Sequence, residues 1–213
     1  MLLYFTSLQV DISEHSADQN IKLEAQELLA LLTPIAKAFI TETGYESANL
    51  ALQCFGGHGY IREWGMEQNV RDARIATLYE GTTGIQALDL LGRKVLMTQG
   101  QTLKRFTKII HKFCQAESDN TKLREFIKPL TQHYKEWGDM TTQLGFKAMR
   151  NRDEVGAAAV DYLMYSGYVA LAYFWARAAL IAQKAINNGA EDKAFYKAKI
   201  HTARFYFERI LPR

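Results

Sequence analysis

The sequence predicts an all-α protein, with an antiparallel helical bundle in residues 1–100 and a further helical bundle, an extension, in residues 101–213. Apolar residues recur three and four positions apart along much of the chain, as they do on the buried face of a helix. Only three of the 213 residues are proline, and no segment shows the strict alternation of a half-buried strand. The hydrophobic content of 48% is enough for a packed core.

The first elements are predicted from periodicity and from helix-ending residues. Residues 1–15 show no strong period and are expected to form a loosely held lead-in. A helix is predicted over residues 21–32. Thr33-Pro34 is predicted to separate it from a second helix that runs to Phe55, because threonine caps helices and proline fits a first turn. Gly56-Gly57 is predicted to stop that second helix.

Shorter pieces are predicted next. We expect a short helix through Met66–Ala73 and an extended segment over Ile75–Tyr79. Thr83 and Gln86 have the spacing of a capping box, in which a hydroxyl and a side chain three residues later satisfy helix-start amides. The helix that begins there is predicted to reach about Phe113, with Gly100 as a point where it bends or breaks.

Three further helices are predicted over residues 121–149, 155–188 and 192–211. The middle one is apolar, but Asp161 and Arg177 interrupt it, and the uncharged stretch between them is shorter than the roughly 20 residues that a bilayer requires. We therefore expect a buried bundle helix and no transmembrane segment.

Composition narrows the function classes. The net charge of +3 comes from interspersed basic and acidic residues, so neither nucleic acid nor an anionic membrane is expected as a partner. Two cysteines, Cys54 and Cys114, do not make a disulfide framework, and a reducing cytoplasm is the expected location. His111 and Cys114 share a helix face, but two ligands do not make a metal site, and no metal is expected.

The chemically informative tetrapeptide is Tyr79-Glu80-Gly81-Thr82. It places a carboxylate directly before a predicted helix, where backbone N–H groups lack helical partners and can bind a carbonyl oxygen or an anion. Gly81 lets a flat ligand approach the backbone closely. Glu80 is therefore either a base for a carbon acid held by those donors or an ordinary helix-start acid stabilised by the helix dipole.

Three separated motifs decide between these alternatives. Their order and spacing resemble the C-terminal helical domain of acyl-CoA dehydrogenases, and residues after 100 resemble the C-terminal extension of the larger members. Only residues 1–15 lie outside the resemblance. The motifs are Gln53-x-x-Gly56-Gly57-x-Gly59-Tyr60, Arg71-Asp72-Ala73-Arg74 and Tyr79-Glu80-Gly81-Thr82-x-x-Ile85-Gln86.

The resemblance implies α,β-dehydrogenation of acyl-CoA to trans-2-enoyl-CoA, with Glu80 as the base that removes the α-proton. It also implies that the Glu80 N–H and the flavin ribityl chain bind the thioester oxygen, which stabilises the developing enolate. Glu80 and Gly81 are thus the expected substrate-binding residues. Burial in the substrate pocket is expected to raise the pKa of the Glu80 carboxyl.

The resemblance further implies cofactor and partner contacts. Thr82 falls where the family contacts FAD, while Gln53 and Gly57 fall where it contacts the adenine end of FAD bound by a neighbouring subunit. A homo-oligomer is therefore expected, with electron-transfer flavoprotein as the electron acceptor. Gly84 departs from the family, in which many members have a polar side chain at this position.

Other features have simpler interpretations. Arg71, Asp72 and Arg74 are expected to form an ion-paired cluster that braces the Glu80 loop. No β-rich segment is present to cover the flavin ring, so the chain alone is expected to be incomplete for catalysis and to retain FAD poorly. Two alternatives stay open: a non-catalytic helical oligomerisation module that survives from such an enzyme, and an acyl-CoA oxidase with the same base.

Overall fold

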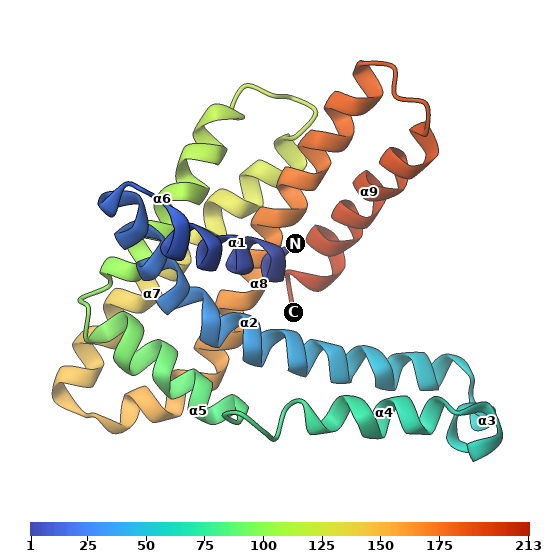
Figure 1. Cartoon of the computed structure of the whole chain (residues 1–213), viewed down its shortest axis with the longest axis horizontal. Coiled ribbons are helices and arrows are strands. Elements are labelled where there is room, and N and C mark those ends of the chain that lie inside the picture. The colour runs from blue at the N-terminus through green and yellow to red at the C-terminus, as the bar shows by residue number, and fades with distance from the viewer.

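The computed structural model describes residues 1–213 as helices joined by turns, without strands (Figure 1). The all-α prediction is confirmed. Nine α-helices, one short 3-10 segment (η1) and two π-helical segments (η2 and η3) follow one another along the chain. They are α1 (Leu2–His15), α2 (Gln19–Cys54), α3 (Gly57–Tyr60), η1 (Arg62–Trp64), α4 (Met66–Ile75), α5 (Thr83–Leu88), η2 (Asp89–Leu96), α6 (Gln101–Ala116), α7 (Arg124–Arg150), α8 (Asp153–Asn187), α9 (Lys193–Phe205) and η3 (Tyr206–Ile210).

Helix α2 is continuous through Pro34, so the predicted break at Thr33-Pro34 is wrong. An internal proline destabilises a helix by about 3 kcal/mol, because it lacks an N–H and crowds the preceding turn. Here Leu32 and Ile35, on either side of the proline, are both fully buried in one core. Continuous burial of that stripe outweighs the local penalty. Asp18 caps the helix, its carboxylate accepting from the Asn20 amide at 2.7 Å.

The expected lead-in, residues 1–15, is instead the helix α1, which packs along α2. The buried residues of α1 are Leu2, Thr6 and Gln9. Two of these three are polar, which explains why the sequence shows no apolar period. The Thr6 hydroxyl donates to the Leu2 carbonyl at 3.0 Å, so its burial leaves no unpaired group.

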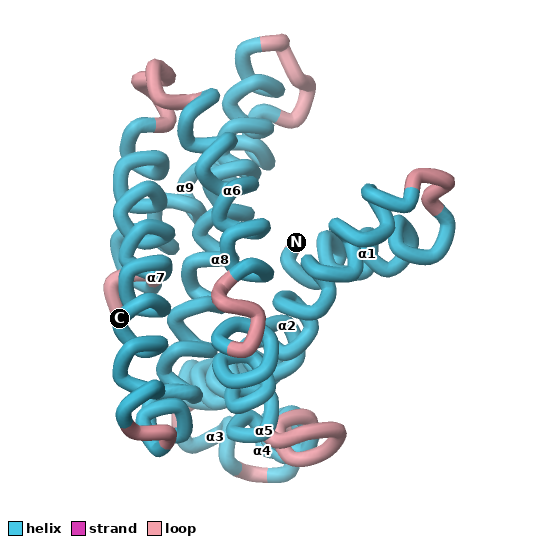
Figure 2. Tube along the Cα trace, turned by 90° about the vertical axis from the view of Figure 1, so that its left-hand side faces the viewer, coloured by secondary structure: helices cyan, strands magenta, loops and turns pink.

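Helices α6 to α9 form an upright antiparallel bundle, from which α1 and the start of α2 lean away (Figure 2). The predicted helices over 121–149, 155–188 and 192–211 correspond to α7, α8 and α9 with η3. Gly100, in the left-handed conformation at φ 75°, separates η2 from α6 as anticipated. The predicted extended segment at Ile75–Tyr79 is wrong, because α4 continues to Ile75 and turns follow it.

Helix α8 lies at the centre of the molecule and contacts α1, α2, α5, η2, α7, α9 and η3. It is long and apolar enough to cross a membrane by length and composition, and 44% of its most apolar window is buried inside this protein. One hydrophobic core extends from Leu31 and Leu91 through Phe106 to Trp137 and Tyr162. The boundary predicted near residue 100 stays a prediction, since this core is continuous across it.

The second half of α2 projects from the bundle and pairs with α4, with α3 at the tip (Figure 1). We call residues 40–79 the arm. The last buried residue of α2 is Phe39, and α4 has none. Apart from Gly59 at the tip and Thr77 near the base, no arm residue is buried, so the two arm helices cover little apolar surface.

Candidate functional site

The turn that carries Glu80 lies at the base of the arm, between α4 and α5. Glu80 has a φ of 53° and Gly81 a φ of 92°. Glycine adopts such angles freely, but a non-glycine residue there is uncommon and strained. A side chain at position 81 would also contact the amide of Gln86. The turn therefore requires glycine at 81 and tolerates strain at 80.

Three side chains hold this turn in place. Lys37 on α2 donates to the Gly81 carbonyl at 2.6 Å. The Gln86 amide donates to the Glu80 carbonyl at 3.2 Å, and the Thr83 hydroxyl donates to the Glu42 carboxylate. The predicted capping box is thus not formed: Thr82 is the N-cap without a side-chain bond, while Thr83 and Gln86 have other partners. Sequence reasoning missed the anchoring roles of Lys37 and Glu42, which lie 44 and 41 residues from their partners.

The functional groups of the turn remain free. The Glu80 carboxylate is exposed and makes neither a hydrogen bond nor an ion pair within the chain. The backbone N–H groups of Glu80, Gly81 and Thr82 likewise have no acceptor in the chain. A carboxylate beside unpaired N–H donors can accept a proton from a carbon acid whose carbonyl oxygen those donors bind. The chain itself does not bury Glu80, so the pocket expected around it is not formed by these residues alone.

Gln53 and Gly57 lie at the other end of the arm. Gln53 is on the last turn of α2 and Gly57 begins α3, and both are exposed. The residue that ends α2 in the positive-φ region is Gly56, at φ 58°, rather than Gly57. Gly59 packs directly against the carbonyl of Leu52, which leaves no space for a side chain. The structure therefore brings Glu80, Gly81 and Thr82 together but separates them from Gln53 and Gly57 (Figure 1).

The expected ion-paired cluster in α4 is absent, so that prediction is wrong. The Asp72 carboxylate accepts from the Gln68 amide at 2.6 Å rather than pairing with an arginine. Arg74 donates to the Thr77 hydroxyl at 2.6 Å, and its guanidinium lies 5.4 Å from the centroid of the Tyr45 ring. An arginine near an aromatic face is favoured by cation–π attraction. Arg74 thus joins α4 to α2 through an aromatic contact and not through a charge pair.

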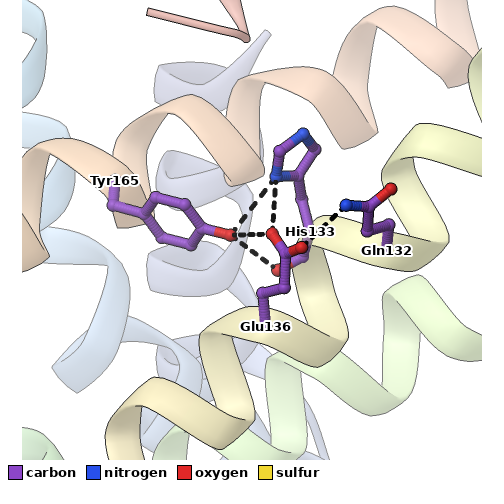
Figure 3. Close-up of polar contacts among 4 residues, drawn as sticks. All are labelled: Gln132, His133, Glu136 and Tyr165. Atoms are coloured by element: carbon purple, nitrogen blue, oxygen red, sulfur yellow. Dashed lines mark hydrogen bonds and ion pairs between the residues drawn. The ribbon is translucent and has the colours of Figure 1, made fainter.

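A second polar cluster lies between α7 and α8 (Figure 3). The Tyr165 hydroxyl is 3.1 Å from the His133 carbonyl and 3.2 Å from the Glu136 carboxylate, and His133 Nδ1 is 3.2 Å from the same carboxylate. The hydrogen bond from Gln132 holds the pKa of Glu136 below its usual value, and burial raises the pKa of Tyr165. None of the main pockets is lined by these residues, so the cluster links two helices rather than forming an active site.

No group of three or more histidine, cysteine, aspartate or glutamate side chains is placed to hold a metal ion. His111 instead contacts the Tyr134 hydroxyl through Nδ1 at 2.8 Å. Cys114 is a buried free thiol, and burial raises its pKa.

Comparison with known families covers both halves of the chain. The family described as acyl-CoA dehydrogenase, C-terminal domain, matches residues 12–96, and the one described as acetyl-CoA dehydrogenase C-terminal like matches residues 106–213. The chain belongs to the acyl-CoA dehydrogenase family. The family predicted from three sequence motifs is thereby confirmed. The first match ends at residue 96 and the second begins at residue 106.

Individual proteins similar to this acyl-CoA dehydrogenase chain support the same family. It is 35% identical to 3-methylmercaptopropionyl-CoA dehydrogenase of Ruegeria pomeroyi, over 95% of the chain and 34% of that protein. It is 30% identical to a butyryl-CoA dehydrogenase of Syntrophomonas wolfei, over 99% of the chain and 35% of that protein. Over 36% of the chain and 24% of the relative it is 34% identical to the caffeyl-CoA reductase-Etf complex subunit CarC of Acetobacterium woodii. The chain thus spans about a third of the length of the first two relatives.

Proposed function

We propose that the chain is the C-terminal part of an FAD-dependent acyl-CoA dehydrogenase, which converts an acyl-CoA to the trans-2-enoyl-CoA with Glu80 as the base. The observation that carries the proposal is the unpaired Glu80 carboxylate, on a turn that three side chains fix to its surroundings. The family membership of the chain supports the reaction class.

In this mechanism Glu80 accepts the proton that leaves the α-carbon. The free N–H of Glu80 donates to the thioester oxygen, which gains negative charge as the proton leaves. Gly81, without a side chain, allows the thioester to lie against the backbone. FAD, when bound, supplies the acceptor for the hydride from the β-carbon, so that a carbon–carbon double bond remains.

The residues present fit the edge of an FAD site. The Thr82 hydroxyl and the Gln53 amide are exposed and make no hydrogen bond in the chain, so both are free to bind a cofactor. They lie at opposite ends of the arm, and none of the main pockets contains either one. We infer that Thr82 contacts FAD beside Glu80, whereas Gln53 and Gly57 contact FAD held by a neighbouring subunit.

The same proposal names partners and a location. Electron-transfer flavoprotein is the proposed acceptor, supported by the family and by a relative whose name includes an Etf complex. A homo-oligomer is also proposed, and the separation of Gln53 and Gly57 from Glu80 supports it, because one FAD cannot be assigned to both ends of the arm. A reducing cytoplasm is the proposed location, in keeping with the two free thiols of Cys54 and Cys114.

A titration of the chain with FAD tests how much of the site it contains. We expect weak or no binding, because no cavity of this chain encloses a flavin ring between the predicted contacts. Flavin fluorescence would follow the titration. Near-stoichiometric binding at micromolar concentration would show that the chain forms a complete FAD site, against the proposal.

The role of Glu80 is tested in a protein that joins this chain to the preceding segments of its relatives. Glu80→Gln keeps the shape and the N–H donor but cannot accept the proton, so acyl-CoA-dependent flavin reduction should fall by about 10²–10⁴-fold with acyl-CoA affinity retained. The matched control is Glu63→Gln, an exposed carboxylate in η1. If Glu80→Gln reduced its flavin as fast as the unsubstituted protein, Glu80 would not be the base. Peroxide formation by the unsubstituted protein in air would indicate an oxidase.

The alternative of a non-catalytic helical module has one observation in its favour, the open position of Glu80 in the chain alone. The joined protein distinguishes the two functions. A protein that binds FAD and acyl-CoA but never reduces the flavin would support the non-catalytic module.

A further inference from the structure

A second site lies outside the arm and is lined by residues of the start of α1, of α8 and of α9; these three elements come near one another beside the N-terminus (Figure 1). The pocket has a volume of about 490 Å³, and nine of its eleven lining residues are hydrophobic. None of these residues belongs to the Glu80 turn or to the arm. The apolar wall includes Met1, Phe5, Phe174, Ile181, Phe195 and Tyr196.

Several apolar side chains of this wall are about half exposed to solvent. Ile181 is 58% exposed, Phe195 49% and Met1 48%. Pockets of about 300–1,000 Å³ that combine an apolar lining with a few polar groups are the usual sites of small ligands. The size and lining of this pocket therefore suit a ligand with one apolar chain.

The charged side chains that line the pocket are Arg177 and Lys199, the α-amino group of Met1 adds a positive charge, and no carboxylate lines the pocket. Neither cation forms an ion pair in the structure. The Arg177 guanidinium lies 5.5 Å from the centroid of the Tyr173 ring, and Lys199 Nζ lies 4.8 Å from that of Phe195. Two cations held over aromatic faces, beside an apolar pocket, form the complement of an anion with an apolar tail.

We propose that this pocket binds a medium-chain fatty-acid anion, with the carboxylate facing Arg177 and Lys199 and the chain lying against the aromatic wall. A single chain is favoured because the volume lies in the lower half of the range for ligand pockets. A carboxylate is favoured because two unpaired cations face an otherwise apolar site. The proposal is independent of the function of Glu80.

Calorimetric titration of the 213-residue chain with sodium decanoate, below its micelle concentration, tests the proposal. We expect decanoate to bind at one site, and decan-1-ol and decyltrimethylammonium at least about tenfold more weakly, because they lack the anion that Arg177 and Lys199 recognise. Equal affinity for decanoate and decan-1-ol, or no decanoate binding, would overturn the proposal.

Two sets of variants locate the site. Arg177→Gln and Lys199→Gln should each weaken decanoate binding by about tenfold and leave decan-1-ol binding unchanged. Lys197→Gln, on the exposed side of α9 outside the pocket, is the matched control and should leave decanoate binding unchanged. Circular dichroism establishes that each variant is folded, and Lys199→Gln, on the surface helix α9, provides a test even if Arg177→Gln unfolds.

Ala178→Phe tests occupancy, because Ala178 lines the pocket and the larger side chain fills it. Binding of decanoate and decan-1-ol should both be lost in this variant. If Ala178→Phe left decanoate binding intact, the proposal would be wrong. A change in the oligomeric state of that variant would then indicate that the pocket is a contact between copies of the chain.

Discussion

At the scale of single residues, Glu80 is placed by groups that belong to distant parts of the chain. Its positive φ is unusual for a residue with a side chain, and it is maintained while the carbonyls of Glu80 and Gly81 accept hydrogen bonds from Gln86 and Lys37. The Lys37 bond is charge-assisted, which makes it the stronger of the two. The orientation of the Glu80 carboxylate thus depends on a lysine of α2.

Replacing Lys37 with methionine should therefore loosen the turn. We expect Lys37→Met to lower the free energy of unfolding by about 1 kcal/mol, the usual contribution of a partly exposed hydrogen bond, and to speed exchange of the hydrogen-bonded amides at residues 86–88, which follow the turn. Lys22→Met removes a lysine that also donates to a carbonyl, that of Glu14, on an exposed surface. Equal exchange rates at residues 86–88 of both variants would show that Lys37 does not position the turn.

The sequence predicted Glu80 and Thr82 as neighbours because they are adjacent in the chain. It could not predict the contacts of Lys37 and Glu42, since each joins residues more than forty positions apart and neither leaves a local pattern. The capping box failed for the same reason. Its spacing was present, but Glu42 offered Thr83 a charged acceptor that a local pattern does not include.

At the scale of helices, local rules hold at surfaces and fail where packing is tight. Gly56 follows the end of α2 and Gly100 separates η2 from α6, as predicted, because each adopts a positive φ in a turn with no other atom near its α-carbon hydrogen. Pro34 does not end α2, because the residues around it are buried in the core. Periodicity thus predicted the positions of α7, α8 and α9 but not α1, whose buried face is mostly polar. The continuity of α2 depends on contacts with α8 that the sequence does not display.

At Gly167, α8 packs closely against Phe39 of α2. A methyl group there would overlap the ring of Phe39, which itself packs edge-on against Tyr168 with centroids 5.0 Å apart. Overpacking a core usually destabilises by about 1–3 kcal/mol, and the rigid ring places Gly167→Ala near the upper end. Urea unfolding would measure this loss of stability.

The matched control is Gly156→Ala, in the same helix, where an added methyl group meets no other atom. This variant should raise stability by up to about 1 kcal/mol, because alanine is the better helix former. Opposite signs for the two variants are the expected result. If Gly167→Ala were also stabilising, α8 and α2 would not be in close contact.

At the scale of the whole molecule, the protein combines a packed bundle with an arm that is poorly covered. The bundle core is continuous, but Tyr60, Trp64 and Ile75 on the arm are 78%, 53% and 56% exposed. Scattered apolar residues are ordinary on protein surfaces, whereas several on one projecting element indicate a contact surface. The chain spans about a third of its relatives' length, so parts of a longer protein or a second copy are available to cover the arm.

Self-association is the outcome that this surface predicts for the chain by itself. The arm tip carries Gln53 and Gly57, whose proposed ligand belongs to a neighbouring subunit, and the exposed Tyr60 is adjacent to them. A two-fold contact buries the same patch on both copies, so a single chain can satisfy it without another partner. Light scattering over a dilution series should therefore show a dimer or a larger even oligomer.

Tyr60→Lys should shift the oligomer toward monomer, since the new charges would face each other across the contact. Met149→Lys, which changes an 84% exposed residue at the end of α7, is the control and should leave the oligomeric state unchanged. A monomer at high micromolar concentration in the parent chain would mean that the arm is stable without a second copy.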